Sequence, residues 1–209
     1  AYIDLKIKNR VLIDVSKRST ETEIFGKKIA MPYGISPTGA AGLVYYGGEI
    51  GLAKAAARMG VPCTVATNAL LPMEEIAEAA GGNLWFQLYM WADKEMSMKF
   101  LERVKVAGFD TLIVTVDGPV GPNREYNKKN GFATPLKYTP KLLAQLLVKP
   151  NWCYQVLLKQ YVNRGEFKKE NYPEELERSV LSSKDFLLDT SDAADDRLRD
   201  ERGCRRSVT

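Results

Sequence analysis

Several polar side chains follow short apolar segments of the sequence, in positions from which they could bind a small molecule. They are Thr38, Thr67, Gln87, Tyr89, Thr115 and Asp117. The set holds hydroxyls, an amide and a carboxylate, so it can both donate and accept hydrogen bonds. The carboxyl ends of parallel strands meet at one edge of a sheet, and α/β proteins bind their ligands there. If the apolar segments are such strands, these side chains share one ligand site.

Histidine is absent from all 209 residues. This composition excludes a Ser-His-Asp triad, a Cys-His dyad and a histidine-ligated metal site within the chain. The three cysteines, Cys63, Cys153 and Cys204, form no CxxC pair and predict no disulfide framework. We predict no metal site, and any reaction that needs an imidazole base must obtain it from outside these residues.

Apolar segments alternate with helical patterns along the first part of the chain. The expected strands are residues 31–36, 61–66, 83–90 and 111–116, and the expected helices are residues 48–59, a helix that Pro72 opens, and residues 93–106 with Asp93 as N-cap. This alternation predicts βαβ units and a parallel sheet. The strand segments are apolar throughout, which is typical of parallel strands covered on both faces. Two shorter segments, residues 11–15 and 23–25, are expected to be strands or extended arms.

The pattern changes after Asp117. Residues 118–135 are rich in Gly, Pro and Asn and predict a loop, whereas residues 138–158 carry apolar side chains at helical spacing. Basic side chains accompany residues 136–162, so this segment is either an ordinary surface helix or an amphipathic helix on a membrane surface. Residues 161–209 are charged, and we expect them to form a disordered tail.

Composition narrows the class of protein. The formal net charge of +4 is too small to predict a nucleic-acid partner. No apolar stretch is long enough to span a bilayer, and no signal peptide is visible. We expect a cytoplasmic protein, with peripheral attachment to the inner face of the membrane as the alternative that residues 136–162 leave open.

Three motifs give the sequence a family resemblance: residues 31–40 (MPYGISPTGA), 85–89 (WFQLY) and 115–125 (TVDGPVGPNRE). Their order and spacing resemble the FMN-dependent 2-hydroxy-acid dehydrogenases and oxidases, a family that includes glycolate oxidase, L-lactate dehydrogenase and mandelate dehydrogenase. The resemblance implies an α/β fold of the (β/α)8 TIM-barrel class, which usually needs ~250 residues. Residues 1–160 then form a partial barrel of about the first four βα units, followed by the tail.

The resemblance implies FMN as the cofactor and places six residues beside its ring. This cofactor-binding set is Pro37, Thr38, Gly39, Thr67, Gln87 and Thr115. The lack of a side chain on Gly39 permits a close approach, and the amide of Gln87 can donate and accept at once. Each position also has an ordinary alternative, because Pro and Gly are common in turns, Thr favours strands, and a backbone group can satisfy a buried amide.

The resemblance also implies that Tyr89 and Arg124 bind a small 2-hydroxy acid, and that Asp117 pairs with a catalytic histidine. A guanidinium matches a carboxylate through two hydrogen bonds, although a lone arginine in a loop is otherwise a solvated charge. The histidine is missing, and Asn127 and Gly131 stand where the family usually has Asp and Arg. The implied reaction is oxidation of the hydroxy acid to a 2-oxo acid, by a homo-oligomer when complete, and we expect this chain alone to be inactive.

Two other interpretations stay open. Another FMN barrel, such as one like inosine-monophosphate dehydrogenase or isopentenyl isomerase, would share the later phosphate-binding part of the fold rather than the motifs retained here. A non-catalytic fragment, or a half-barrel that depends on a partner, would bind flavin weakly or not at all. Within the hydroxy-acid family, Gly39 favours a dehydrogenase over an oxidase.

Overall fold

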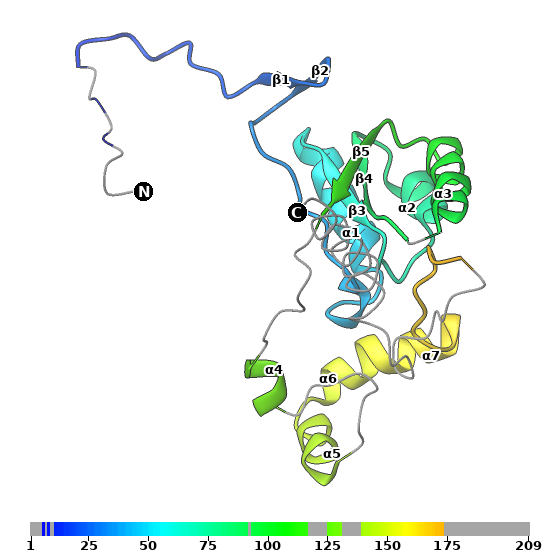
Figure 1. Cartoon of the computed structure of the whole chain (residues 1–209). Coiled ribbons are helices and arrows are strands. Elements are labelled where there is room, and N and C mark those ends of the chain that lie inside the picture. Colours follow the sequence, from blue (N-terminus) through cyan, green and yellow to red (C-terminus); the bar gives the residue numbers. More distant parts are fainter. Residues whose placement is uncertain are drawn as a thin grey trace, which may run out of the picture.

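The computed structural model describes residues 6, 8, 11–91, 93–116, 125–130 and 139–173. Its centre is a three-stranded parallel sheet in the order β3 (Cys63–Ala66), β4 (Leu84–Tyr89) and β5 (Thr111–Thr115). In the middle strand, Phe86 pairs with Val65 on one side and with Leu112 on the other. The expected parallel sheet is therefore present (Figure 1).

Three helices connect the strands: α1 (Gly48–Met59), α2 (Met73–Ala80) and α3 (Lys94–Val106). α1 ends at Gly60, whose φ of 65° lies in the left-handed region that glycine adopts without a Cβ clash. The side chain of Asp93 caps α3, because it accepts hydrogen bonds from two backbone N–H groups of the first turn. The predicted helices, including the cap, are thus confirmed.

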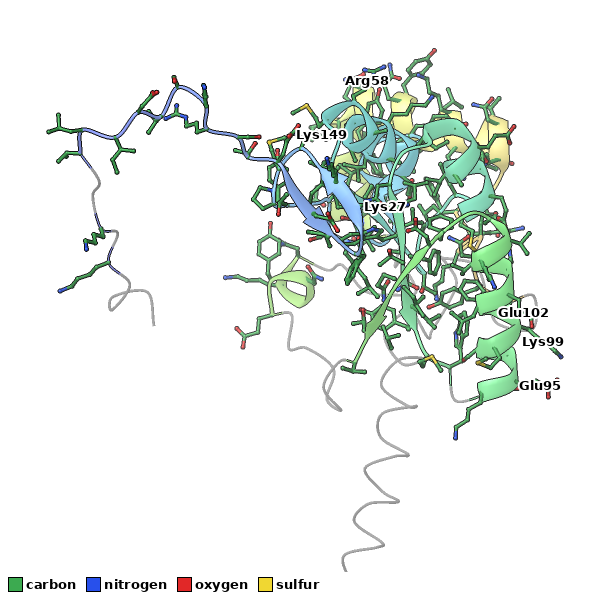
Figure 2. The ribbon with its side chains drawn as sticks, turned by 90° about the horizontal axis from the view of Figure 1, so that it is seen from above. Lys27, Arg58, Glu95, Lys99, Glu102 and Lys149 are labelled. Carbon is green, nitrogen blue, oxygen red and sulfur yellow. The ribbon has the colours of Figure 1, made fainter. Side chains whose placement is uncertain are left out.

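The apolar core lies between the sheet and these helices. Phe86 of β4 is fully buried, and its ring lies 5.5 Å from the rings of both Phe100 and Phe109. On the opposite side of α3, Glu95 and Lys99 point away from the sheet (Figure 2), with Lys99 Nζ 2.9 Å from Glu95 Oε1. One apolar and one charged face explain why the residues of α3 form a helix that packs on the sheet.

The first expected strand forms only in part. Ile35 alone pairs with β3 there, through a parallel bridge to Cys63. Pro32 has no N–H to donate to a neighbouring strand. The next residue, Tyr33, donates its N–H to the backbone O of Met31 at 2.8 Å, which closes a tight turn. This segment therefore runs beside β3 without becoming a regular strand.

The amino-terminal segments differ from each other. Strands β1 (Thr22–Ile24) and β2 (Lys27–Ile29) form a two-stranded antiparallel hairpin. Residues 11–15, the other expected strand, are described but adopt no strand, and this part of the chain extends away from the sheet (Figure 1). The expected strand near residues 23–25 is thus confirmed, within one residue.

A helical layer follows β5. It comprises α4 (Glu125–Lys129), α5 (Pro140–Leu147), α6 (Pro150–Trp152), the π-helical turn η3 (Cys153–Leu158) and α7 (Lys159–Arg164). The last three follow one another without interruption, beside the α/β body (Figure 1). We call residues 150–173 the arm: this helix together with the segment that returns to the body. Residues 161–173, assigned to the tail from the sequence, belong to the arm, and the rest of the expected tail lies outside the described residues.

The residues that the structure describes form a partial α/β fold and do not close a barrel. The expectation that every strand is covered on both faces is wrong for β5, where Leu112 and Val114 are exposed. These two side chains alternate with half-buried neighbours along the strand. The reason is positional, because β5 is an edge strand of the described sheet and its outer face lacks a complete cover.

Candidate functional site

Thr67, Gln87 and Thr115 form one hydrogen-bonded network at the carboxyl edge of the sheet. Thr67 Oγ1 donates to the backbone O of Gln87 at 2.6 Å, and Thr67 N donates to Gln87 Oε1 at 3.3 Å. On its other side, Gln87 Nε2 donates to Thr115 Oγ1 at 3.0 Å. A single amide thus joins the ends of three neighbouring strands. The structure brings these three predicted residues together.

Tyr89 borders the same network. It is the last residue of β4 and lies in register with Thr115 of β5. Its backbone N–H donates to Thr67 Oγ1 at 3.3 Å, so the Thr67 hydroxyl both accepts from Tyr89 and donates to Gln87. Because side chains alternate along a strand, Tyr89 and Gln87 project from the same face of the sheet.

Two turns lie next to each other beside this network: the first turn, residues 37–43, and the second turn, residues 67–73. The backbone N–H of Ala40 donates to the backbone O of Asn68 at 2.9 Å. A Cβ added to Gly39 would lie 3.2 Å from Asn68 Cβ, which is tighter than ordinary contacts. A Cβ at position 39 would therefore require the neighbouring Asn68 side chain to shift by a few tenths of an ångström.

The two turns differ in how their polar side chains are placed. Pro37 and Thr38 are exposed, and Thr38 Oγ1 donates to the backbone O of Ser36 at 3.3 Å. Asn68 Oδ1 is buried, and no donor among the described residues reaches it. A buried acceptor without a donor is costly unless water or a ligand supplies one. The exposed first turn beside the Gln87 amide, which can donate and accept at once, fits a planar ring whose edge carries both N–H and carbonyl groups.

Glu49 is a site residue that the sequence analysis missed. Its side chain is buried, and Oε1 accepts hydrogen bonds at 3.1 Å from the backbone N–H of Gly42 in the first turn and of Leu70 in the second. One carboxylate oxygen therefore ties the two turns together. The only sequence signal is an acidic residue in the first turn of an Ala-rich helix, which is ordinarily explained by the helix dipole.

The remaining candidates contribute less to the described site. Asp117 and Arg124 lie outside the described residues, so their roles stay predictions. Within the described ranges, no group of three or more His, Cys, Asp or Glu side chains could hold a metal ion. Burial raises the pKa of the Cys63 thiol to about 11. Cys63 is therefore protonated at neutral pH and packs in the core.

A family comparison and individual relatives both match this chain over most of its length. The sequence pattern of the family described as FMN-dependent dehydrogenase matches residues 1–194. The match continues past residue 160, so the similarity extends beyond the three motifs and into the arm. The L-lactate dehydrogenase of Vibrio parahaemolyticus is 39% identical over 153 residues, which are 73% of this chain and 40% of that protein. The L-lactate dehydrogenase of Ectopseudomonas mendocina is 38% identical over the same shares.

Solved structures agree with the sequence comparisons. The crystal structure of the monotopic membrane protein (S)-mandelate dehydrogenase superposes with a TM-score of 0.72 and 30% identity, covering 92% of this chain and 48% of that one. A mandelate oxidase superposes with a TM-score of 0.58 and 37% identity, covering 62% of this chain and 39% of that one. The chain spans about 40% of the length of the curated relatives named above.

Replacing Glu49 tests whether its carboxylate holds the two turns. Glu49→Ala leaves two buried N–H groups without an acceptor, so we expect the free energy of unfolding to fall by roughly 2–5 kcal/mol. Glu49→Gln keeps a carbonyl oxygen for both donors and should lose less than half as much. Urea denaturation followed by circular dichroism measures both variants. Equal losses, or a loss below about 0.5 kcal/mol for Glu49→Ala, would contradict this role.

Proposed function

The chain belongs to the FMN-dependent dehydrogenase family, and from this premise we propose that it forms the part of a flavoenzyme that holds the flavin ring and a 2-hydroxy acid. The observation that carries the proposal is the network of Thr67, Gln87 and Thr115 at one sheet edge. FMN, the cofactor of this family, supplies a ring that accepts two electrons when bound. The chain's own residues position the ring and the acid and form hydrogen bonds with them.

Within this proposal, the first turn lies against the flavin ring through Pro37, Thr38 and Gly39. The exposed surface of residues 37–39 supports the assignment, because a flat ring needs a wall that other parts of the chain do not cover. Gln87 bonds the ring edge, and its link to Thr115 fixes the orientation of the amide.

The substrate in this proposal is a small 2-hydroxy acid. Relatives that are L-lactate dehydrogenases, together with a mandelate dehydrogenase structure, support this substrate class. Tyr89, on the same strand face as Gln87, bonds the acid, and Arg124 binds its carboxylate with two hydrogen bonds. The choice of acid, the electron acceptor and the homo-oligomeric state stay predictions.

Proton transfer is the step that these residues do not complete. The reaction removes a proton from the substrate, and the proposed role of Asp117 is to stabilise the imidazolium that forms. The chain contains no histidine, so the base has to come from another polypeptide segment. We therefore extend the proposal: these 209 residues bind flavin without turning over a hydroxy acid. A non-catalytic half-barrel that binds flavin weakly remains the alternative.

A second proposal concerns a membrane surface. Apolar side chains are exposed on α5, α7 and the link between α5 and α6, among them Leu143, Leu147, Val148, Tyr161 and Val162. The mandelate dehydrogenase that covers 92% of this chain is a monotopic membrane protein. No helix of the described residues is long and apolar enough to cross a bilayer. We propose peripheral contact with anionic lipid through residues 136–162, in preference to an ordinary surface helix.

Flavin binding tests the first proposal. A titration of the purified chain with FMN, followed by visible absorption, should saturate with a shifted flavin spectrum. Gln87→Leu removes the side-chain hydrogen bonds to Thr67 N and Thr115 Oγ1, keeps the backbone bonds to Thr67, and should weaken binding at least about tenfold, or about 1.4 kcal/mol. The control Gln145→Leu changes an exposed glutamine of α5 and should bind as the unaltered chain does.

Three results would contradict parts of this proposal. No uptake of FMN by the unaltered chain would remove the flavin site and favour the non-catalytic half-barrel. Equal binding by Gln87→Leu and Gln145→Leu would remove the role of the network. Bleaching of bound flavin by anaerobic lactate or mandelate would overturn the claim that the chain lacks turnover.

Vesicle sedimentation tests the membrane proposal. The chain should sediment with vesicles that contain phosphatidylglycerol, and Leu147→Glu should reduce the bound fraction several-fold because a charge enters the apolar face. Val106→Glu places the same charge on α3, away from the helical layer, and should have no effect. If the two variants sediment equally, or if the unaltered chain stays in solution, the segment is an ordinary surface helix.

A further inference from the structure

We infer that the arm holds the two turns of the candidate flavin site in place from outside the sheet, with Trp152 and Asn171 as positioning residues. The inference rests on the proposed function for its meaning, since the two turns are the proposed flavin wall. The claim that the arm holds the turns rests on hydrogen bonds between residues that are about 100 positions apart in the sequence.

The first contact is between the arm and the first turn. Trp152, where α6 meets η3, donates its indole N–H to the backbone O of Leu43 at 3.0 Å. Leu43 ends the short 3₁₀ helix η2 (Ala41–Leu43), and the last carbonyls of a helix lack partners within it. The indole therefore satisfies a helix-end carbonyl and fixes the end of the first turn.

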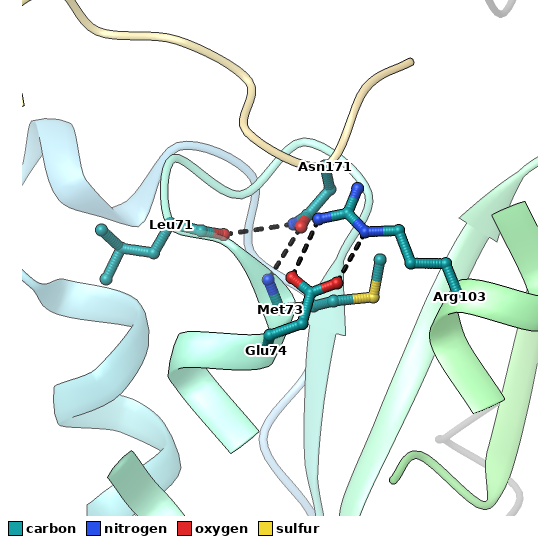
Figure 3. A network of polar contacts seen from close by, with 5 residues as sticks. All are labelled: Leu71, Met73, Glu74, Arg103 and Asn171. Atoms are coloured by element: carbon teal, nitrogen blue, oxygen red, sulfur yellow. Dashed lines mark hydrogen bonds and ion pairs between the residues drawn. The ribbon is translucent and has the colours of Figure 1, made fainter. Parts of the chain in front are cut away.

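The second contact is between the arm and the second turn. Asn171 is fully buried; its Oδ1 accepts from Met73 N at 2.8 Å, and its Nδ2 donates to the backbone O of Leu71 at 3.3 Å (Figure 3). Met73 begins α2, whose N-cap position holds Pro72. Proline has no side-chain acceptor, so the cap that a local Ser, Thr or Asp would usually provide comes from a distant residue.

An apolar cluster joins the same three parts. Ala40 of the first turn, Leu70 of the second turn, and Val156 and Phe167 of the arm pack together as buried residues. Leu70 also donates its N–H to Glu49 of α1, so the second turn is held both by α1 and by the arm. Close-packed interiors are hardly compressible and transmit displacements. Moving the arm would therefore displace both turns.

The arm directs particular side chains toward the two turns. Val162 and Tyr161 of the arm are exposed, whereas Trp152, Val156 and Asn171 face the turns. Tyr172 of the arm also packs in the main core, with its ring 5.8 Å from that of Trp91. Loss of the Trp152 and Asn171 hydrogen bonds alone leaves this contact in place, so it should loosen the two turns and leave the sheet intact. A residue that only supports the fold would weaken the sheet and the turns together.

The test uses the whole chain and two variants that remove the polar groups while keeping an apolar side chain of related shape. Asn171→Leu removes both hydrogen bonds to the second turn, and Trp152→Phe removes the indole N–H from the first turn. The control Asn163→Leu alters an exposed asparagine of α7 whose amide bonds only its own helix, through the backbone O of Lys159. Hydrogen–deuterium exchange in the absence of flavin is read over residues 37–44, 67–74 and 84–89.

We expect exchange over residues 67–74 to rise at least tenfold in Asn171→Leu, and over residues 37–44 in Trp152→Phe, with no change over residues 84–89. The control should match the unaltered chain throughout. Unchanged exchange in both turns, or a uniform rise that includes residues 84–89, would overturn the inference. An FMN titration of the same samples should show at least tenfold weaker binding for both arm variants.

The two proposals fail in different ways. If the unaltered chain takes up no FMN, the proposed function is contradicted, and the exchange pattern still decides whether the arm holds the turns. If the chain binds FMN and the arm variants bind it equally well despite looser turns, the arm does not position the flavin site. That second result would overturn the inference and leave the proposed function standing.

Discussion

The structure depends on how the buried second turn satisfies its backbone hydrogen bonds. A buried backbone N–H or C=O group without a partner costs free energy, and this turn uses three distant side chains as partners. Gln87 of β4 accepts from Thr67 N through its backbone O, at 3.1 Å, and through Oε1, at 3.3 Å. Glu49 of α1 accepts from Leu70 N, and Asn171 of the arm accepts from Met73 N. All three are buried, so none is easily replaced by water. The candidate site is therefore a meeting point of sheet, helix and arm.

This arrangement explains why the arm and the two turns belong to one structural unit. The sheet edge supplies Thr67, Gln87 and Thr115, while the first turn supplies an exposed surface and packs closely on the second turn at Gly39. The arm supplies no predicted ligand contact. Its contribution is to hold the ends of both turns through Trp152 and Asn171, which keeps the hydrogen-bonding groups at fixed spacing.

The sequence predicted what depends on local pattern and missed what depends on long-range contacts. The helix at residues 48–59 and the cap at Asp93 follow from spacing and side-chain chemistry within one segment. The shortening of the first strand to Ile35 follows from a tight turn that no periodicity reveals. The roles of Glu49 and Asn171 are side-chain bonds to distant backbone, and a single sequence carries no signal for such pairs.

The most direct test of the central claim is an absorption titration with lumiflavin, a flavin ring without the ribityl phosphate chain. The residues assigned to the site face the ring alone, so the account predicts saturable binding and a shifted spectrum, with an affinity within about tenfold of that for FMN. Absence of lumiflavin binding, while FMN binds, would place the recognition on the phosphate chain. That result would contradict the claim that the Gln87 edge and the two turns form the flavin site.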